Sequence, residues 1–333
     1  MPILRQIAAV SSVAFALAAG STAAHAEKIT IMVGGATKII YLPAKLTEQL
    51  GYFKDEGLDV EIQSQPAGVD AENELRAGAV QGVVGFYDHC VDLQVKGKFI
   101  ESVVQMGHAP GEVELVSNKY PNVKTMADLK GKTLGVTGLG SSTNFLTQFL
   151  MVKAGVPVGQ FTSSPVGAGS TLIIAMQQDK IQAGMTTEPT ITRLVKTNQA
   201  RVLVDLRTSE STRAALGGTY PAASLYMPTE WVNSHKPVVQ KLTNAFVKTL
   251  RYISTHSGAE IAAKMPKDFF VGDEQGYIKA LDAGKGMFTV DGVMPKGGPE
   301  TVLKVLSTFS PAVKGKTIDL SKTYTTEFVS KVK

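Results

Sequence analysis

Residues 135–146 read Gly135-Val136-Thr137-Gly138-Leu139-Gly140-Ser141-Ser142-Thr143-Asn144-Phe145-Leu146. The pattern is typical of a strand end, a glycine turn and the first turn of an amphipathic helix, which Gly155 and Pro157 then end. The hydroxyl of Ser141 or Ser142 is placed to cap this helix. The first N–H groups of a helix have no acceptor within the helix and lie at the positive end of its dipole. The turn therefore predicts an anion site.

The turn fits neither of two familiar phosphate-binding motifs. A P-loop needs a lysine before its Ser or Thr, and no lysine lies between Gly135 and Asn144. The dinucleotide-binding fingerprint needs a third glycine where Thr143 stands. A purely structural turn without a ligand is the alternative, so the rest of the chain has to decide between them.

The N-terminus has the pattern of an export signal. Arg5 precedes the apolar stretch 7–19, and residues 24–26 (Ala-His-Ala) fit the small-x-small cleavage pattern. The apolar stretch is shorter than the ~20 residues of a membrane-spanning helix. We therefore expect a signal peptide at 1–26, cleavage after Ala26 and a mature protein in the periplasm.

The composition excludes several classes of function. The 333 residues include 34 basic and 29 acidic side chains, and this mild excess without a basic run argues against a nucleic-acid partner. The lone Cys90 rules out an internal disulfide and CxxC redox chemistry, and the five histidines lack the spacing of a metal site. We expect no metal and no cofactor. At 44% hydrophobic residues, the core alone can stabilise a two-domain chain.

Strands and helices alternate along the first third of the chain. Strands are expected at 28–33, 58–62 and 82–85, and helices at 43–50 and 70–76. This alternation predicts an α/β fold with a mostly parallel sheet and crossover helices.

An internal repeat indicates that the fold contains two similar halves. Residues 79–83 resemble residues 180–184, an offset of 101, and Gly68 matches Gly169 at the same offset. At roughly similar offset, the strand at 28–33 matches 132–136, and each strand runs into glycines. We expect two α/β lobes of like topology, each with a glycine loop at the carboxyl edge of its sheet.

Two glycine-rich segments interrupt the pattern and are expected to connect the lobes. Residues 107–111 separate strand-like 102–105 from 113–116, and 217–221 precede a strand at 223–227. The remaining segments, 229–256, 273–283 and 299–308, read as helices that pack back on the first lobe. The expected organisation is a signal peptide at 1–26, the first lobe at 27–108, the second lobe at 109–219, and a return to the first lobe with the C-terminal helices at 220–333.

Two stretches carry a resemblance to a known family. The first is Gly51-Tyr52-Phe53 with Glu56-Gly57-Leu58-Asp59-Val60-Glu61, and the second is 129–136 followed by 138–143. They resemble the nitrate/sulfonate/taurine class of ABC-transporter substrate-binding proteins, which includes binders of thiamine pyrimidine precursors. Glu188-Pro189 occupies the place of that family's usual Trp-Glu-Pro, with Thr187 in place of Trp. The likeness covers the chain from 27 to about residue 230.

The resemblance implies a type II periplasmic-binding-protein fold, in which two similar α/β lobes are joined by two hinge crossings. It also implies a monomer that binds a small-molecule ligand between the lobes and delivers it to an ABC permease in the inner membrane. The implied ligand-binding residues are Thr37, Tyr41, Gly68, Phe86, Tyr87, Asp88 and His89 from the first lobe, Gly140, Ser141, Ser142, Thr143, Thr187 and Glu188 from the second, and His108 and Tyr220 beside the hinge.

Asp88, His89 and Cys90 together also raise the possibility of a nucleophilic catalytic site. Adjacent residues at a helix start do not point at a common atom, so an enzyme is not expected. Asp88 either caps the helix predicted at 91–96 or contacts the ligand. An unpaired carboxylate beside a purely anionic ligand costs desolvation energy, so Asp88 favours a ligand with a donor or cationic group.

The sequence therefore predicts a binding protein that captures a small polar or anionic organic molecule, such as a sulfonate, an aromatic carboxylate or a pyrimidine, by hinge closure. Two alternatives remain open at this point. One is an enzyme of pyrimidine-precursor metabolism on the same fold, and the other is a ligand-loaded partner of a membrane receptor. The ligand itself is not named by the sequence.

Overall fold

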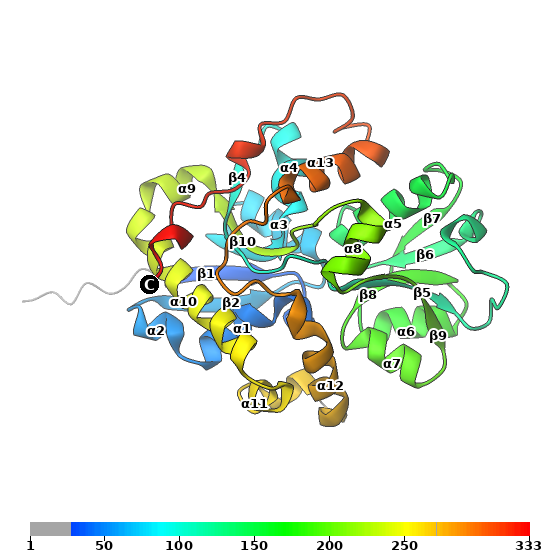
Figure 1. The fold of residues 1–333 in the computed structure, drawn as a ribbon, viewed down its shortest axis with the longest axis horizontal. Helices are drawn as coiled ribbons and strands as arrows, with labels where there is room; N and C mark the ends of the chain where they lie inside the picture. Colours follow the sequence, from blue (N-terminus) through cyan, green and yellow to red (C-terminus); the bar gives the residue numbers. More distant parts are fainter. Residues whose placement is uncertain (1–27, 271) are drawn as a thin grey trace, which may run out of the picture.

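The computed structural model describes residues 28–270 and 272–333, and the expected signal peptide at 1–26 lies outside them. The described chain forms two α/β lobes, each built on a five-stranded sheet, with the C-terminal helices around them (Figure 1). The two sheets repeat one topology, with strand orders β2-β1-β3-β10-β4 and β7-β6-β8-β5-β9.

The first lobe carries its helices between successive strands. Its strands are β1 (Lys28–Val33), β2 (Asp59–Ser64), β3 (Gly82–Phe86), β4 (Ile100–Gln105) and β10 (Ala223–Pro228). Its helices are α1 (Leu42–Gln49), α2 (Tyr52–Asp55), α3 (Gly68–Arg76) and α4 (Asp88–Val95). The expected elements of this lobe are confirmed to within a few residues, except that α4 begins at Asp88 and not at 91.

The second lobe repeats this arrangement. Its strands are β5 (Glu112–Ser117), β6 (Thr133–Val136), β7 (Thr162–Pro165), β8 (Ala183–Thr187) and β9 (Ala200–Leu206), and its helices are α5 (Ser142–Lys153), α6 (Ser170–Gln177), α7 (Thr190–Lys196) and α8 (Ser209–Leu216). The sequence patterns did not predict β7, β9 or α8. In β7 the reason is composition, since the strand reads Thr-Ser-Ser-Pro and has no apolar alternation.

Each sheet is mixed, with one antiparallel strand among four parallel ones. In the first sheet β10 runs antiparallel to β3 and β4, and in the second β5 runs antiparallel to β8 and β9. These are the strands by which the chain enters a lobe after crossing from the other one. Their reversed direction puts their N-terminal ends beside the carboxyl ends of the parallel strands.

The internal repeat is confirmed by two glutamines in equivalent positions. Gln81 binds Thr30 of β1 through both its backbone N–H (3.1 Å) and its side-chain oxygen (2.8 Å). Gln182 binds Thr133 of β6 through the same two groups, at 2.9 Å each. The repeated sequence thus corresponds to repeated geometry: each glutamine binds a residue near the start of the first parallel strand of its lobe, β1 or β6.

The C-terminal segment does not pack on the first lobe alone. It contains α9 (Thr229–Ser234), α10 (Lys236–Thr255), α11 (Gly258–Ala262), α12 (Glu274–Gly284) and α13 (Gly298–Phe309). Helix α10 packs on the first lobe, where Phe246 meets Phe53 edge-on at 5.3 Å between ring centroids. Helix α13 packs against α5 of the second lobe, with Phe309 and Phe145 5.9 Å apart. Short 3-10 helices are η1 (Ile39–Tyr41), η2 (Met126–Leu129), η3 (Lys267–Phe270), η4 (Lys285–Met287), η5 (Leu320–Lys322) and η6 (Val329–Lys331).

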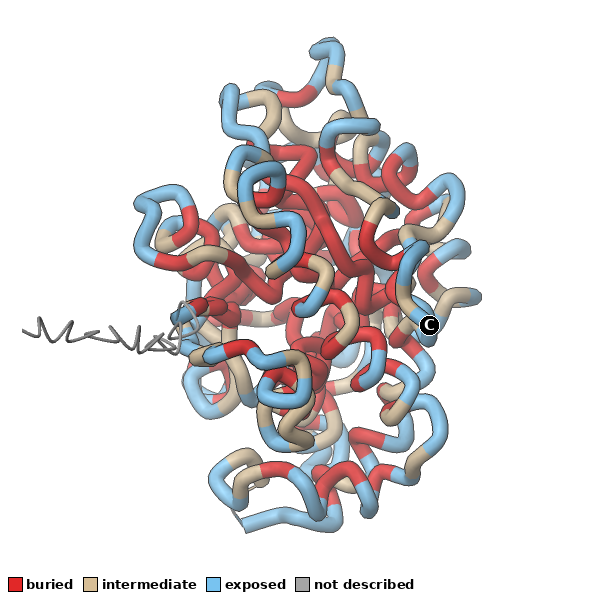
Figure 2. Tube along the Cα trace, turned by 90° about the vertical axis from the view of Figure 1, so that its left-hand side faces the viewer, coloured by how far each residue is buried: buried red, intermediate tan, exposed pale blue. Residues whose placement is uncertain are grey.

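Burial is concentrated along the sheets and between the lobes (Figure 2). One large apolar cluster extends through both lobes, and a smaller one, including Leu115 and Ile181, lies in the second lobe. Within residues 28–270 and 272–333, no helix has both the length and the apolar character needed to cross a membrane.

Candidate functional site

The glycine turn before α5 faces the first lobe across the interlobe cleft. Ser141 occupies the N-cap position, but its hydroxyl makes no capping bond. It instead accepts a hydrogen bond from the backbone N–H of Val69 in α3, at 3.4 Å. The predicted hydroxyl cap is therefore wrong, because the other lobe takes the side chain. The N–H of Gly140 is satisfied locally by Asn144 Oδ1, at 3.1 Å.

A small closed chamber lies between this turn and the first lobe. Its volume is about 10 Å³, so the lobes are nearly in contact around it. The residues that line it come from both lobes: Lys38, Ile40, Tyr41, Gly68, Glu112, Thr137, Ser141, Ser142, Thr143 and Thr187.

Asp88 ties three parts of the chain together beside the chamber. Its Oδ1 accepts a hydrogen bond from Ser142 Oγ of the second lobe, at 2.9 Å, and its Oδ2 accepts one from Tyr220 OH, at 2.8 Å. Asp88 itself belongs to α4 of the first lobe, and Tyr220 to the segment that returns from the second. Burial raises the pKa of the Asp88 carboxyl, while neighbouring His89 and these two hydrogen bonds act in the opposite direction.

Two polar groups in the chamber wall have no hydrogen-bond partner among the described residues. They are Oε2 of Glu112 and Oγ1 of Thr187, each in a side chain that is only 2% exposed. Burial raises the pKa of Glu112 well above its ordinary value, with repulsion from Asp88 adding to the effect and Lys38 opposing it.

Lys38 lies in the chamber wall, but its ammonium group binds carbonyl oxygens of the first lobe. Its Nζ donates to the carbonyl oxygens of Gly34 (2.6 Å) and Pro66 (3.2 Å). Burial lowers the pKa of Lys38 to about 8, although Glu112 and Asp70 favour the charged form. The lysine thus holds two loops of the first lobe together.

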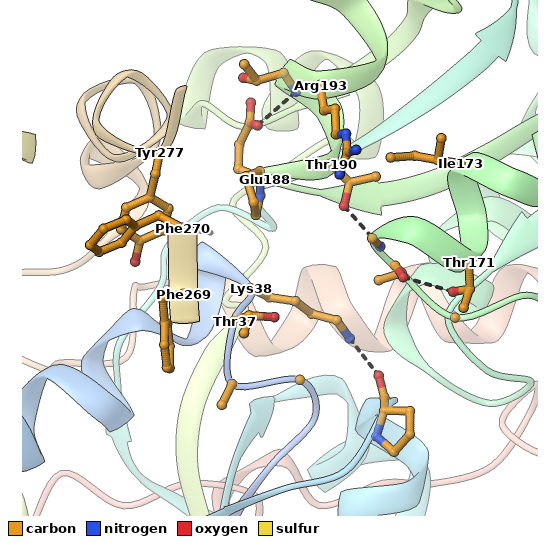
Figure 3. Close-up of a pocket in the computed structure, with 18 of the residues that line it drawn as sticks. Thr37, Lys38, Thr171, Ile173, Glu188, Thr190, Arg193, Phe269, Phe270 and Tyr277 are labelled. Carbon is orange, nitrogen blue, oxygen red and sulfur yellow. Dashed lines mark hydrogen bonds between the residues drawn. The ribbon is translucent and has the colours of Figure 1, made fainter. Parts of the chain in front are cut away.

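A larger groove, about 730 Å³, is also lined by Lys38 (Figure 3). Its polar wall includes Thr37, Glu188, Thr190 and Arg193, and its aromatic wall consists of Phe269, Phe270 and Tyr277. The backbone N–H of Ile39 donates to the carbonyl of Glu188 across the lobes, at 3.2 Å. This bond lies where residues of the groove and residues of the chamber adjoin.

A family model described as NMT1/THI5 like matches residues 41–259. The chain belongs to the NMT1/THI5-like family. A solved structure of a protein from Bordetella bronchiseptica RB50 shares 36% sequence identity, with 91% of this chain and 96% of that chain covered and a TM-score of 0.86. No curated protein sequence matches the chain.

Two more distant structures have the same fold as this NMT1/THI5-like chain. The alkanesulfonate-binding protein SsuA from Xanthomonas axonopodis pv. citri, bound to MOPS, shares 15% identity over 91% of this chain and 99% of that one, with a TM-score of 0.73. The periplasmic nitrate-binding protein NrtA from Synechocystis PCC 6803 shares 12% identity over 91% and 87%, with a TM-score of 0.71. The expected periplasmic-binding-protein fold is confirmed.

The residues predicted from the sequence as ligand contacts fall into four groups in this NMT1/THI5-like protein, according to their position relative to the chamber and the groove. The chamber is lined by Tyr41, Gly68, Ser141, Ser142, Thr143 and Thr187. The outer groove is lined by Thr37 and Glu188. Asp88, Tyr220 and Gly140 adjoin the chamber without lining it. Phe86, Tyr87, His89 and His108 line neither space.

The residues of this last group have structural partners. Phe86 meets Tyr41 edge-on at 6.2 Å and so supports a chamber wall. Tyr87 pairs through its hydroxyl with Thr323, near the C-terminus. His89 lies 2.7 Å from Glu72, and His108 donates its backbone N–H to Met287 in a hinge crossing. Glu188 is also engaged, since its carboxylate accepts the N–H of Thr192 and pairs with Arg207.

Asp88, His89 and Cys90 do not converge on a common atom. Asp88 is directed to the second lobe, His89 to Glu72, and Cys90 is fully buried, which raises the pKa of its thiol well above the ordinary value. A protonated, buried thiol is a poor nucleophile. Among residues 28–270 and 272–333 there is also no group of three or more His, Cys, Asp or Glu side chains that could hold a metal ion.

Sequence reasoning missed Glu112 and Lys38 as residues of the site. Glu112 is the first residue of β5 and lies opposite Thr187, the last residue of β8. This pairing brings the start of one strand to the edge where parallel strands end. A mostly parallel sheet does not predict this position for Glu112, because the starts of parallel strands lie at the edge away from the site. The available signal was a charged residue directly before the strand-like segment 113–116.

Proposed function

We propose that this protein is the periplasmic substrate-binding protein of an ABC importer, and that it captures a small polar or anionic organic molecule between its lobes by hinge closure. The observation that carries the proposal is the chamber: polar groups from both lobes surround it, and beside it Ser142 of the second lobe is bonded to Asp88 of the first. Ligand contacts with both lobes favour the closed state, since only that state offers both sets of contacts at once.

The hinge for this motion consists of the two crossings. Residues 106–111 and 217–222 run side by side, with the N–H of Ala222 bonded to Gly107 O at 2.9 Å. The buried amide of Gln105 donates to Gly107 O (2.7 Å) and to Ala223 O (3.1 Å), which fixes one crossing against the other. Two short crossings that lie together suit a hinge, because a few backbone dihedral angles can absorb the lobe rotation.

The partner in this function is an inner-membrane permease that recognises the closed lobes of a monomer. Support for export comes from the sequence pattern of residues 1–26, and the fold is shared with a nitrate-binding and an alkanesulfonate-binding protein. A non-enzymatic role agrees with the separate directions of Asp88, His89 and Cys90. The candidate ligands are sulfonates, aromatic carboxylates and pyrimidine-like molecules.

Ligand retention tests the proposal. The protein is incubated with a small-molecule cell extract, separated by gel filtration and analysed by native mass spectrometry. The control that should not bind is the variant Gly138→Val, because its added side chain would meet Ala67 and Val69 of the opposite lobe. We expect a compound retained by the wild type alone, and its addition should raise the melting temperature of the wild type. Equal retention by this control, or chemical turnover of the compound, would refute the function.

A further inference from the structure

Glu112 and Thr187 form a polar pair that the closed fold leaves incomplete. They are direct cross-strand neighbours in β5 and β8, both are 98% buried, and both line the chamber. Neither Oε2 of Glu112 nor Oγ1 of Thr187 has a hydrogen-bond partner among residues 28–270 and 272–333. Buried polar atoms are nearly always bonded, so an unpartnered carboxylate oxygen beside an unpartnered hydroxyl indicates a binding position.

The neighbouring side chains do not supply the missing donor. Lys38 directs its ammonium to the carbonyls of Gly34 and Pro66. The charged and titratable groups that act on Glu112 are Asp88, Lys38 and Glu114, and Glu112 acts in turn on Tyr41 and Tyr220. The two unpartnered oxygens are hydrogen-bond acceptors, so this part of the chamber favours a positive charge or N–H groups.

Another part of the chamber wall, from the same lobe, has the reverse character. There the backbone N–H groups of Ser142 and Thr143 open α5, a helix of 12 residues, and neither has an acceptor within the described chain. They lie at the positive end of the helix dipole, which favours an anionic or acceptor group. A third wall is the ring of Tyr41, supported by Phe86.

We infer, on the basis of the proposed function, that the cleft selects a molecule that carries both a cationic or N–H donor group and an anionic or acceptor group. Glu112 and Thr187 bind the donor group, and the first turn of α5 binds the acceptor group. Anions without a donor are disfavoured, since they offer the buried oxygens of Glu112 and Thr187 no N–H group.

Isothermal titration with two matched pairs of probes tests this inference. The pairs are 4-(aminomethyl)benzoate with 4-methylbenzoate, and 3-aminopropanesulfonate with propanesulfonate. We expect the amine of at least one pair to bind at least tenfold more tightly than its partner, and Glu112→Gln to abolish that preference. Glu114→Gln is the matched control, because Glu114 is also buried in β5 but does not line the chamber. It should leave the preference intact.

A second measurement does not depend on the folding of a variant. Burial raises the pKa of Glu112 well above its ordinary value, and an ammonium group bound beside it lowers that pKa again, so binding should release a proton. The binding enthalpy of the amine should then differ between phosphate and Tris buffers, and that of its donor-free partner should not. Binding of the amine without proton release would contradict a role for Glu112.

The outcomes separate the inference from the function on which it rests. If the donor-free acids bind as tightly as the amines, the inference is overturned and the binding function stands. The inference is also overturned if none of the four probes binds while the extract yields a retained compound without an N–H or cationic group. If the extract yields no retained compound and no probe binds, the proposed function fails and the inference fails with it.

Discussion

Ser142, at the start of α5, donates its hydroxyl to Asp88 of α4 across the cleft, at 2.9 Å. The other oxygen of the same carboxylate accepts the hydroxyl of Tyr220. One buried side chain therefore joins the first lobe, the second lobe and the returning crossing. Because a buried carboxylate oxygen is costly when it has no donor, this arrangement stabilises the closed form relative to the open one under the hinge motion that we propose.

Ser142→Ala should shift the protein toward the open state. The change leaves Asp88 Oδ1 without its interlobe donor, which costs about 1–3 kcal/mol in the closed form, whereas water can satisfy the oxygen in the open form. Small-angle X-ray scattering should show a larger radius of gyration than in the wild type. The control is Ser254→Ala, whose exposed hydroxyl bonds only Arg251 of its own helix. Identical scattering of Ser142→Ala and Ser254→Ala would exclude a role in closure.

Gly138→Val should hold the lobes apart without unfolding them. A Cβ at Gly138 would lie 3.1 Å from Ala67 Cβ and 3.1 Å from Val69 Cγ1, both in the opposite lobe, and the valine methyls add further overlap. We expect an increased radius of gyration, a normal circular dichroism spectrum and loss of ligand retention. Gly286→Val is the control, since a Cβ there meets nothing within 4 Å. Closure of the Gly138 variant to wild-type dimensions would refute the predicted contact.

The buried pair of His89 and Glu72 should make the free energy of unfolding decrease as the pH rises into the alkaline range. Burial by itself lowers the pKa of His89, but Glu72, 2.7 Å away, outweighs it and raises the pKa to about 9. A raised folded-state pKa means that the stabilisation is complete below about pH 6.5 and is lost as the pH rises through about 9. Urea unfolding from pH 6 to 10 should show this loss in the wild type and a flatter profile in His89→Gln.

Substitution of Glu72 measures how much the pair of His89 and Glu72 contributes to the free energy of unfolding at neutral pH. Removing one partner of a buried ion pair costs about 3–5 kcal/mol, so Glu72→Gln should lower the free energy of unfolding by that order. Glu61→Gln is the matched control, because its partner Lys28 and Glu61 itself are largely exposed. We expect almost no change there. Equal effects of the two substitutions would show that His89 and Glu72 do not act as a buried pair.

Glu114→Gln should stabilise the protein at pH 8. Glu114 is fully buried, one oxygen accepts from Thr147 at 2.9 Å, and burial raises its pKa to about 8 despite this bond. The folded state therefore keeps a proton that the unfolded state releases above about pH 4.5, and stability falls as the pH rises through about 8. The variant should exceed the wild type by about 1–3 kcal/mol at pH 8 and by less at pH 5. A constant difference between pH 5 and 8 would contradict this titration.

Much of the fold follows from local patterns that the sequence displays directly. The strand 28–33 and the helix after Pro43 are predicted by apolar spacing and turn residues, and Gln81 and Gln182 identify the repeat. Such signals act within a few residues along the chain, so they do not depend on the rest of the fold. In β7 that signal is lacking, because its residues are polar.

The functional site was only partly predictable, because it depends on contacts between residues that are far apart in the chain. The hydroxyls of 141–143 and the ring of Tyr41 follow glycine-rich loops at strand ends, and the structure places them in the chamber wall. The same patterns predict both Asp88 and His89 as ligand contacts. In the structure, Asp88 faces the second lobe and His89 faces Glu72. Neighbouring residues on a helix diverge, and which direction meets the cleft depends on how the lobes pack.

The sequence by itself determined two repeated α/β lobes with a glycine turn at the start of α5, because periodicity and turn chemistry are local properties. Only the tertiary structure decided what that turn faces. Antiparallel entry of β5 puts Glu112 beside Thr187, and lobe closure brings Ser142 to Asp88. These contacts join residues far apart in the chain, and their free energy depends on burial that exists only once both lobes have assembled.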